Sequence, residues 1–346
     1  MLGLKVPKRN AERVRRYLAR QKLMDINYRI ISCDEFIYFP ILRPRPVDRA
    51  YLTRSGASLS RVAFKATTRK AYDYRSSLRK ALGEDYKLVS KGYDTVGSIA
   101  IIDSEAIGKA KRIGKVIMEL NKNIKTVVMK GGPVAGRFRR RKYRFVAGKR
   151  RYEALYAENG AIFKVDIRRS FFSPRLAYER ERINRLVGRK EKVMVMFAGV
   201  GPFAIEIAKR HRDASVVGIE LNREAYKSMV ENIKLNRVEN FEARLGDVNK
   251  VAVEYRNFAD RIVMPLPKDS YGFLGAAVCA AGRSCIVHYY AFGNRDTAFA
   301  LHKERLGKYF KGHGIRFEVL LEREVRTYSP SEIEIVIDFR IKKPIQ

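Results

Sequence analysis

The chain has 346 residues, of which 46% are hydrophobic, and this length and composition fit two or three folded domains and exclude general disorder. Its 72 Lys and Arg residues against 37 Asp and Glu residues give a formal net charge of +35, so we expect a polyanionic partner. Nucleic acid comes first and an anionic membrane surface second, while a proteome-wide basic bias is the alternative explanation of the charge.

Residues 1–55 predict a small N-terminal domain. Residues 2–6 alternate like a strand, residues 10–22 have helical periodicity, and residues 35–40 form a second strand candidate. The Arg-Pro repeat at residues 43–46 indicates a linker.

Residues 56–160 predict a second, basic domain. A turn and strand are expected over residues 92–102, a helix over 106–121 and a strand over 126–129. Residues 1–160 carry 38 basic and 14 acidic side chains, net +24, against net +11 for the rest of the chain. The polyanion is therefore expected to meet the N-terminal half first.

The tract from residue 136 to 151 contains nine basic residues in sixteen, with aromatic residues between them. Basic side chains neutralise phosphates and aromatic rings stack on unpaired bases, so the tract predicts RNA contact. The alternative is a solvent-exposed basic strand whose aromatic side chains pack inward. The RNA-binding candidates are Arg137, Arg139, Arg140, Arg141, Lys142, Arg144, Lys149, Arg150 and Arg151.

Residues 161–346 alternate predicted strands and helices, which is typical of an α/β fold with a parallel sheet and helices on both faces. An antiparallel pair is expected at the sheet edge from residues 317–323 and 333–341. The predicted strands are residues 192–197, 215–220, 241–247, 260–264 and 284–290, with helices over 202–210 and 223–235.

A glycine loop, AGVGP at residues 198–202, follows the first of these strands and opens a helix. Such a loop lets the backbone approach a ligand at the helix N-terminus. Glu220 ends the second strand, where an acid accepts hydrogen bonds from ribose hydroxyls, and Asp247 ends the third. The alternative for each acid alone is a helix cap. The loop has no third glycine and no following Lys-Ser/Thr pair, which disfavours NAD and a P-loop and favours S-adenosylmethionine.

Arg175, Glu179 and Arg180 precede this loop. Methylation of an amide-like ring nitrogen requires removal of a proton, and Glu179 is the candidate general base. The alternative is that Glu179 caps a helix or pairs with Arg180 or Arg182.

The segment MPLPK at residues 264–268 ends the fourth strand. An unpaired carbonyl in it could accept a hydrogen bond from a substrate amine, because proline removes ladder donors. The alternative is a simple strand terminator.

Together these segments resemble the archaeal and eukaryotic tRNA (guanine37-N1)-methyltransferase family, which includes the related wybutosine-pathway transferases. The motifs that carry the resemblance are YFPI at 38–41, GRFR at 136–139, AG at 147–148, FSPRL at 172–176, FAGVGPF at 197–203 and VHYY at 287–290.

The resemblance implies a class I, Rossmann-like methyltransferase sheet preceded by two small α+β RNA-binding domains, in an enzyme that uses S-adenosylmethionine. The three cysteines and four histidines have no metal-ligand spacing, and the N-terminal residues lack the apolar core of a signal peptide, so we expect no metal and a cytoplasmic location. We also expect a monomer. It implies that Glu179 removes the guanine N1 proton and that Arg139 stabilises charge on the guanine oxygen. It further implies cofactor contacts from Phe171, Arg175, Arg180, Phe197, Ala198, Gly199, Gly201, Glu220, Leu221, Asp247, Val248 and Pro265.

Two positions depart from the family pattern. Val195 stands where the family often has an acid, and Pro265 replaces the asparagine of an Asn-Leu-Pro-Lys motif. The second departure resembles the archaeal branch that also methylates C7 of 4-demethylwyosine, so we expect both substrates to be accepted. A monofunctional enzyme, an aminocarboxypropyl transferase of the same fold and a non-catalytic RNA-binding protein remain the alternatives.

Overall fold

The computed structural model describes residues 2–21, 23–25, 28–33, 35–42, 49–65, 74–89, 92–103, 108–132, 136, 138 and 141–344. The chain divides into two compact units, residues 1–80 and 81–346. The predicted linker at residues 43–46 lies outside the described residues.

The first unit is a four-stranded antiparallel sheet in the order β2-β3-β1-β4, covered by α1. Val14 and Leu18 of α1 pack against Leu4, Val6 and Phe39 of the sheet, because they repeat on one face of the helix. The elements are β1 Leu2–Pro7, η1 Lys8–Asn10, α1 Ala11–Arg20, β2 Ile31–Ser32, β3 Phe36–Pro40, α2 Arg49–Ser55 and β4 Ser58–Arg61.

The second unit begins with another four-stranded sheet, in the order β5-β6-β7-β8, and continues into a separate hairpin of β9 and β10. Only β6 and β7 are parallel in the sheet, and α4 connects them. The elements from the end of the first unit onward are α3 Tyr74–Leu82, η2 Gly83–Leu88, β5 Asp94–Val96, β6 Ile99–Ile102, α4 Ala110–Leu120, β7 Thr126–Lys130, β8 Tyr143–Gly148, β9 Glu153–Glu158 and β10 Ala161–Asp166.

The rest of the second unit is built on a seven-stranded sheet in the order β13-β12-β11-β14-β15-β17-β16. The first five strands are parallel, and β17 and β16 complete the edge antiparallel to their neighbours. The elements are η4 Pro174–Leu176, α5 Ala177–Leu186, β11 Lys192–Met196, α6 Pro202–Arg210, β12 Ser215–Glu220, α7 Arg223–Asn236, β13 Phe241–Leu245, α8 Val248–Glu254, β14 Ala259–Met264, η5 Ser270–Phe273, α9 Leu274–Ala280, β15 Ala281–Asn294, α10 Ala298–Gly312, β16 Arg316–Thr327 and β17 Glu332–Lys342.

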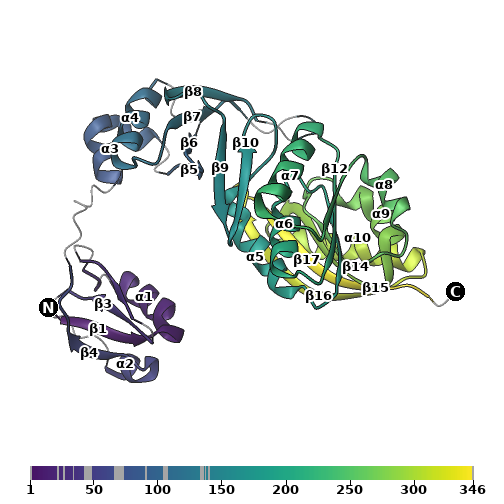
Figure 1. Cartoon of the computed structure of the whole chain (residues 1–346), viewed down its shortest axis with the longest axis horizontal. Coiled ribbons are helices and arrows are strands. Elements are labelled where there is room, and N and C mark those ends of the chain that lie inside the picture. The colour runs from purple at the N-terminus through teal and green to yellow at the C-terminus, as the bar shows by residue number, and fades with distance from the viewer. Residues whose placement is uncertain are drawn as a thin grey trace. The chain divides into compact units, whose positions relative to one another are not determined.

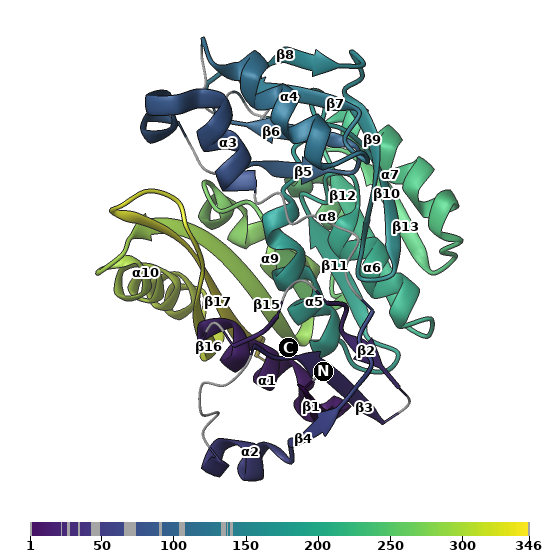
Figure 2. The same cartoon turned by 90° about the vertical axis from the view of Figure 1, so that its left-hand side faces the viewer.

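Helices cover both faces of this sheet (Figure 1). Val193 and Val195 of β11 pack into the core under α5, α6 and α7, while Met194 and Met196 pack into the core under α8, α9 and α10. Figure 2 shows α10 beside the long strands β15 and β17. The parallel sheet with helices on both faces and the antiparallel edge pair are confirmed.

The structure differs from the sequence predictions at the domain boundaries. Strand β4 pairs with β1 from Leu2 to Lys5, so the first domain extends past the predicted boundary at residue 55. The predicted boundary at residue 160 falls in the turn of the β9–β10 hairpin. On the edge of β10 that faces away from β9, Asn232 and Asn236 of α7 accept from the N–H groups and donate to the carbonyls of Lys164 and Ile162, as a neighbouring strand would. Hydrogen bonds from side chains 68 and 74 residues away were not visible in a local pattern.

Within the described residues, no helix combines the length and the apolar character needed to cross a membrane. In the same part of the chain, no group of three His, Cys, Asp or Glu side chains is arranged to hold a metal ion.

Candidate active site

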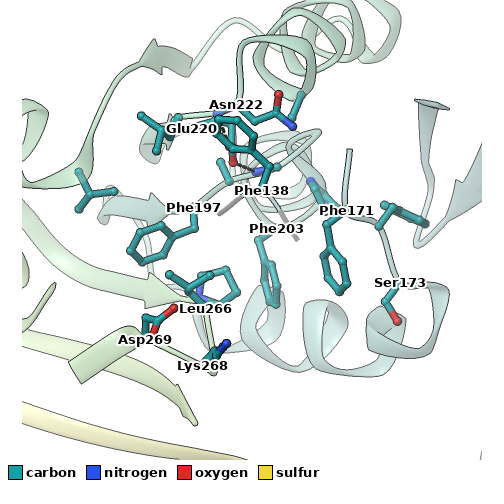
Figure 3. A pocket seen from close by; sticks show the side chains of 18 of the residues that line it. Phe138, Phe171, Ser173, Phe197, Phe203, Glu220, Asn222, Leu266, Lys268 and Asp269 are labelled. Atoms are coloured by element: carbon teal, nitrogen blue, oxygen red, sulfur yellow. Dashed lines mark hydrogen bonds between the residues drawn. The ribbon is translucent and has the colours of Figure 1, made fainter. Parts of the chain in front are cut away.

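A cavity of about 500 Å³, the main cavity, lies at the carboxyl ends of four neighbouring strands (Figure 3). Phe197 follows β11, Glu220 ends β12, Asp247 follows β13 and Pro265 follows β14. Ligands of open α/β sheets bind at this edge. The other lining residues are Gly136, Phe138, Phe171, Phe172, Ser173, Leu176, Arg180, Ala198, Gly199, Pro202, Phe203, Leu221, Asn222, Ala225, Val248, Leu266, Lys268, Asp269 and Phe273.

The predicted glycine loop forms one wall of the main cavity. Phe197, Gly199 and Gly201 have φ angles of 59°, 61° and 89°, so the chain turns sharply between β11 and α6. Gly199 lines the cavity, whereas Gly201 does not. A Cβ atom on Gly201 would lie 2.9 Å from Ile205 Cδ1 and 3.0 Å from Met229 Cγ, so this glycine allows close packing under the loop.

Glu220 fixes the loop through both carboxylate oxygens. The Gly199 N–H donates to its Oε2 and the Asn222 N–H to its Oε1, each at 2.7 Å. Burial raises the pKa of Glu220, and these backbone hydrogen bonds oppose the shift. Asp247 accepts from Asn249 N at 3.0 Å and so caps α8 while lining the cavity. The helix-cap alternative therefore holds at Asp247 in addition to its place in the cavity, and not at Glu220, since Asn222 caps α7.

The FSPRL segment forms the opposite wall. Phe171, Phe172 and Ser173 line the main cavity, and Figure 3 shows Phe171 and Phe203 with their rings beside each other across from Phe197. Arg175 does not line this cavity. Its guanidinium forms two hydrogen bonds to Asp94 of β5, at 2.8 and 3.0 Å, a partner 81 residues away in the chain.

Arg180 is a buried cation at the cavity wall. It forms an ion pair with Glu158, with an Nη2–Oε2 distance of 2.7 Å, and lies over the Phe172 ring at 5.2 Å. Glu206 Oε1 lies 3.6 Å from Arg180 Nε. Burial raises the pKa of Glu206 to about 9, although Asn159 donates a hydrogen bond to it. Arg180 and Glu158 therefore form the charged pair, and Glu206 keeps its proton at neutral pH.

Glu179 does not line the main cavity but lies in a buried polar cluster behind it. Its Oε2 accepts from Arg182 Nε and Tyr290 Oη, both at 3.0 Å. Its Oε1 accepts no hydrogen bond in the described part of the chain and lies 3.4 Å from Arg323 Nη1. The pairing of Glu179 with Arg182, one of the alternatives from the sequence, is thus present.

Asp338 of β17 anchors this cluster. It accepts from Arg182 Nη1 at 2.6 Å and from His288 Nδ1 at 2.7 Å. Arg261 Nη1 faces His288 Nε2 at 2.7 Å, so the ring proton lies on Nδ1 and the imidazole is neutral. Burial lowers the pKa of His288, consistent with this form.

The MPLPK segment turns tightly at the end of β14. The Met264 carbonyl accepts from Leu266 N at 2.9 Å and Ser270 Oγ at 3.1 Å, and the Pro267 carbonyl accepts from Phe292 N at 3.0 Å. The prediction of an unpaired carbonyl is therefore wrong at these two residues, because the turn itself satisfies the Met264 carbonyl and Phe292 of β15 satisfies the Pro267 carbonyl. Pro265 itself lines the main cavity.

Comparison with known proteins places this geometry in a family. Models of three domains match the chain: the TRM5/TYW2 methyltransferase domain over residues 154–320, the tRNA methyltransferase 5 N-terminal domain over 3–48 and the TYW2 N-terminal domain over 74–151. The tRNA (guanine(37)-N(1))-methyltransferase Trm5b of Pyrococcus abyssi is 36% identical over 342 residues, which cover 98% of this chain and 99% of that protein. The chain belongs to the TRM5/TYW2 methyltransferase family.

Other members of the TRM5/TYW2 family are similar over less of the chain. The tRNA (guanine(37)-N(1))/4-demethylwyosine(37)-methyltransferase Taw22 of Nanoarchaeum equitans is 30% identical over 58% of this chain and 84% of its own. A tRNA(Phe) (4-demethylwyosine(37)-C(7)) aminocarboxypropyltransferase of Pyrococcus horikoshii is 30% identical over 78% of this chain and 96% of its own.

Solved structures of family members superpose on the chain. Trm5b from P. abyssi matches with a TM-score of 0.71 and 34% identity, over 99% of this chain and all of that one. A complex of aTrm5 with tRNALeu matches with a TM-score of 0.66 and 30% identity, over 98% and 99%. TYW2 from P. horikoshii in complex with MeSAdo matches with a TM-score of 0.67 and 27% identity, over 78% and 100%.

The basic tract of this TRM5/TYW2 family member is only partly described. Arg137, Arg139 and Arg140 lie outside the described residues. Arg141 lines a smaller cavity next to the main one. Exposed side chains on or beside β8 are Lys142, Arg144, Lys149, Arg150 and Arg151.

Several residues at the site of this TRM5/TYW2 family member were not predicted from the sequence. Phe138, one of the aromatic residues of the basic tract at residues 136–151, lines the main cavity. Lys268 and Asp269 line the cavity below Leu266 (Figure 3). Asp338 lies in β17, between β15 and β16, and no local signal in the sequence marked its contact with Arg182, which lies 156 residues away.

Proposed function

We propose that the chain transfers a methyl group from S-adenosylmethionine to N1 of the guanosine at position 37 of tRNA. The relatives named as tRNA (guanine(37)-N(1))-methyltransferases over nearly the full length support this reaction. The main support for this reaction is that one cavity is lined by two sets of residues. One set is the glycine loop with Glu220 and Asp247, and the other is the FSPRL segment, which leads in the chain to Glu179 and Arg180. The complex of a family member with tRNALeu supports tRNA as the partner.

The residues of the main cavity fit this cofactor. Carboxylates at two strand ends suit ribose hydroxyls at Glu220 and an adenine amine at Asp247, and apolar walls from Leu221 and Val248 suit a purine ring. When bound, S-adenosylmethionine supplies a methyl group on a positively charged sulfur, which is the electrophile of the reaction. The aromatic side chains of Phe171, Phe197 and other lining residues would exclude water from the transfer.

Glu179 is the proposed general base. Its free oxygen, Oε1, would accept the N1 proton, while Tyr290 and Arg182 hold Oε2 and so orient the carboxylate. Because Glu179 is 2% exposed and lies behind the cavity, the guanine can reach it only after the side chain of Arg323 or of Glu179 moves. The proposed role of Arg139 at the guanine oxygen concerns a residue outside the described part of the chain.

Glu179→Gln tests the assignment. Glutamine keeps the size of the side chain but cannot take a proton, so turnover is expected to fall by about 10²- to 10⁴-fold with tRNA binding intact. Single-turnover methyl transfer from labelled S-adenosylmethionine measures it. The matched control is Glu181→Gln, a half-buried glutamate of the same helix that pairs with Arg185 and Arg210 and does not line the main cavity. A near-normal rate in Glu179→Gln rejects the base.

We infer that 4-demethylwyosine is a second substrate, because Pro265 lines the main cavity and, unlike the asparagine it replaces, has no side-chain amide to hold the edge of a guanine. The Nanoarchaeum relative that is named for both reactions supports this inference. A product mass with an aminocarboxypropyl group instead of a methyl group would favour the related transferase reaction. Our expectations of a cytoplasmic location and a monomer stay predictions, and size-exclusion chromatography with light scattering tests the second.

A further inference from the structure

A second cavity, of about 240 Å³, lies beside the main cavity and shares Phe171, Phe172 and Ser173 with it. One side comes from β5, β6, β7 and the start of β8, and the other from the FSPRL segment and the end of β16. The two cavities are therefore immediate neighbours, with the segment from Phe171 to Ser173 as their common wall. The remaining lining residues are Asp94, Ile101, Lys130, Arg141, Tyr143, Ile167, Ser170, Pro174, Arg175, Arg326, Thr327 and Tyr328.

Four of the lining side chains are cations and one is an anion. Two of the cations, Arg175 and Lys130, share the carboxylate of Asp94, at 2.8 and 3.7 Å. Lys130 also pairs with Asp103 at 2.5 Å. The cations on this side of the cavity are therefore held in place by carboxylates behind or beside them.

The other two cations differ in their partners. Arg326 pairs with Glu334 at 2.6 Å and donates to Ser173 Oγ at 3.3 Å. Arg141 donates to the Gly132 carbonyl at 2.6 Å, and it has no carboxylate partner in the described part of the chain. Four cations thus face three carboxylates, and Arg141 carries the positive charge that is not balanced.

We propose that the second cavity binds a backbone phosphate of the tRNA, one of the two that flank the target guanosine. The inference rests on the proposed function and adds the site that holds the nucleotide's backbone. A phosphate oxygen would accept from Arg141 and from the nearest donors of Lys130 and Arg326.

The size and composition of the cavity favour a phosphate over a base. Its volume is below the roughly 300–1,000 Å³ of cavities that hold small molecules, whereas the main cavity is within that range. In the proposed arrangement, the sugar and phosphates of a guanosine whose base is in the main cavity lie on the side of Phe171 to Ser173, next to the second cavity. A phosphate in the second cavity therefore fixes the position of the backbone while the base is out of the stack.

The test is a double-mutant cycle, in which the dissociation constant of the complex is measured with one change in the protein, with one change in the tRNA, and with both. Full-length tRNA is made with a neutral methylphosphonate in place of the phosphate on the 5′ or the 3′ side of guanosine 37. Fluorescence anisotropy gives the dissociation constant for wild type and for Arg141→Gln at several salt concentrations. The control is Lys115→Gln. Lys115 is exposed on α4 and lines neither cavity, so this change is expected to leave the dissociation constant unchanged.

At one of the two linkages, the methylphosphonate is expected to raise the dissociation constant of the wild-type protein about 5- to 10-fold. Arg141→Gln is expected to raise the dissociation constant for unmodified tRNA by the same factor. Combining the two changes should cost no more than either alone, because they remove the same contact. The slope of log K against log salt should decrease by about 0.7 in Arg141→Gln.

The phosphate site is overturned if Arg141→Gln and the methylphosphonate act independently at both linkages, so that their fold-changes in the dissociation constant multiply. An unchanged salt slope in Arg141→Gln also overturns it. A loss of S-adenosylmethionine affinity in Arg141→Gln, measured by calorimetry, also overturns it and assigns the cation to the cofactor. Binding does not require methyl transfer, so the cycle gives an answer even if the proposed reaction is absent. A wild-type enzyme that methylates tRNA while the cycle is additive would keep the proposed function and remove only this site.

Discussion

Asp338 anchors the buried polar cluster that contains Glu179, because it accepts hydrogen bonds from both Arg182 and His288. Asp338→Asn is therefore expected to destabilise the protein and to displace the carboxylate of Glu179. The side chain of Asp338 is 5% exposed and accepts hydrogen bonds from the charged Arg182 and the buried His288. Asparagine of the same size keeps one acceptor oxygen but turns the other position into a donor. That donor would face Arg182 or His288, and both are donors already.

The magnitude follows from the pKa of Asp338. Burial alone would raise it, but hydrogen bonds from His288 and Arg182 lower it from 3.8 to about 2. One pH unit corresponds to about 1.4 kcal/mol, so the ionised form contributes about 2.5 kcal/mol to the free energy of unfolding. The pKa in the folded protein is lowered. This contribution is therefore fully present above pH 4 and is lost as the pH falls toward 2.

Thermal unfolding at pH 7 and pH 3 measures the effect. Asp338→Asn should lower Tm by about 5–10 °C at pH 7, with a smaller difference from wild type at pH 3. Glu318→Gln removes an exposed partner of Arg340 on the neighbouring strand and should change the free energy of unfolding by less than about 0.5 kcal/mol. An Asp338→Asn protein with wild-type Tm at both pH values would refute the reasoning.

Three more outcomes are expected. Since burial raises the pKa of Glu206 to about 9, the free energy of unfolding of the wild type should fall as the pH rises from about 4.5 to 9, whereas that of Glu206→Gln should not. Urea unfolding at pH 5 and pH 8 measures both proteins, and the same pH dependence in the two would contradict the shift. Reversing the charges of Lys149, Arg150 and Arg151 should weaken tRNA binding and flatten its salt dependence; an unchanged slope moves the RNA contact elsewhere. Pro265→Asn should impair methylation of 4-demethylwyosine more than that of guanosine, and equal rates on the tricyclic base oppose a role for this proline.

Residues that follow strands could be placed from the sequence. Glu220 ends a strand, Asp247 and Pro265 each follow one, and parallel strands bring their carboxyl ends to one edge. The glycine loop was equally visible, because Gly199 and Gly201 need positive φ angles. What the sequence did not reveal is that only Gly199 faces the cavity, since the role of Gly201 depends on side chains of α6 and α7.

Contacts between distant segments were beyond the sequence. Arg175 was assigned to the cofactor from its motif, but it pairs with Asp94, which belongs to a different sheet. Glu179 was recognised by its motif, whereas its partners Tyr290 and Arg323 come from β15 and β16. Polar residues have no periodicity that predicts which partner they will meet, so these pairs appear only when the strands are assembled.

The most direct test of the proposed function is mass spectrometry of nucleosides from unmodified tRNA and from tRNA containing 4-demethylwyosine, after incubation with the protein and S-adenosylmethionine. The account predicts N1-methylguanosine from the first and a singly methylated tricyclic base from the second. An aminocarboxypropyl product, or no methylated guanosine at all, would contradict it.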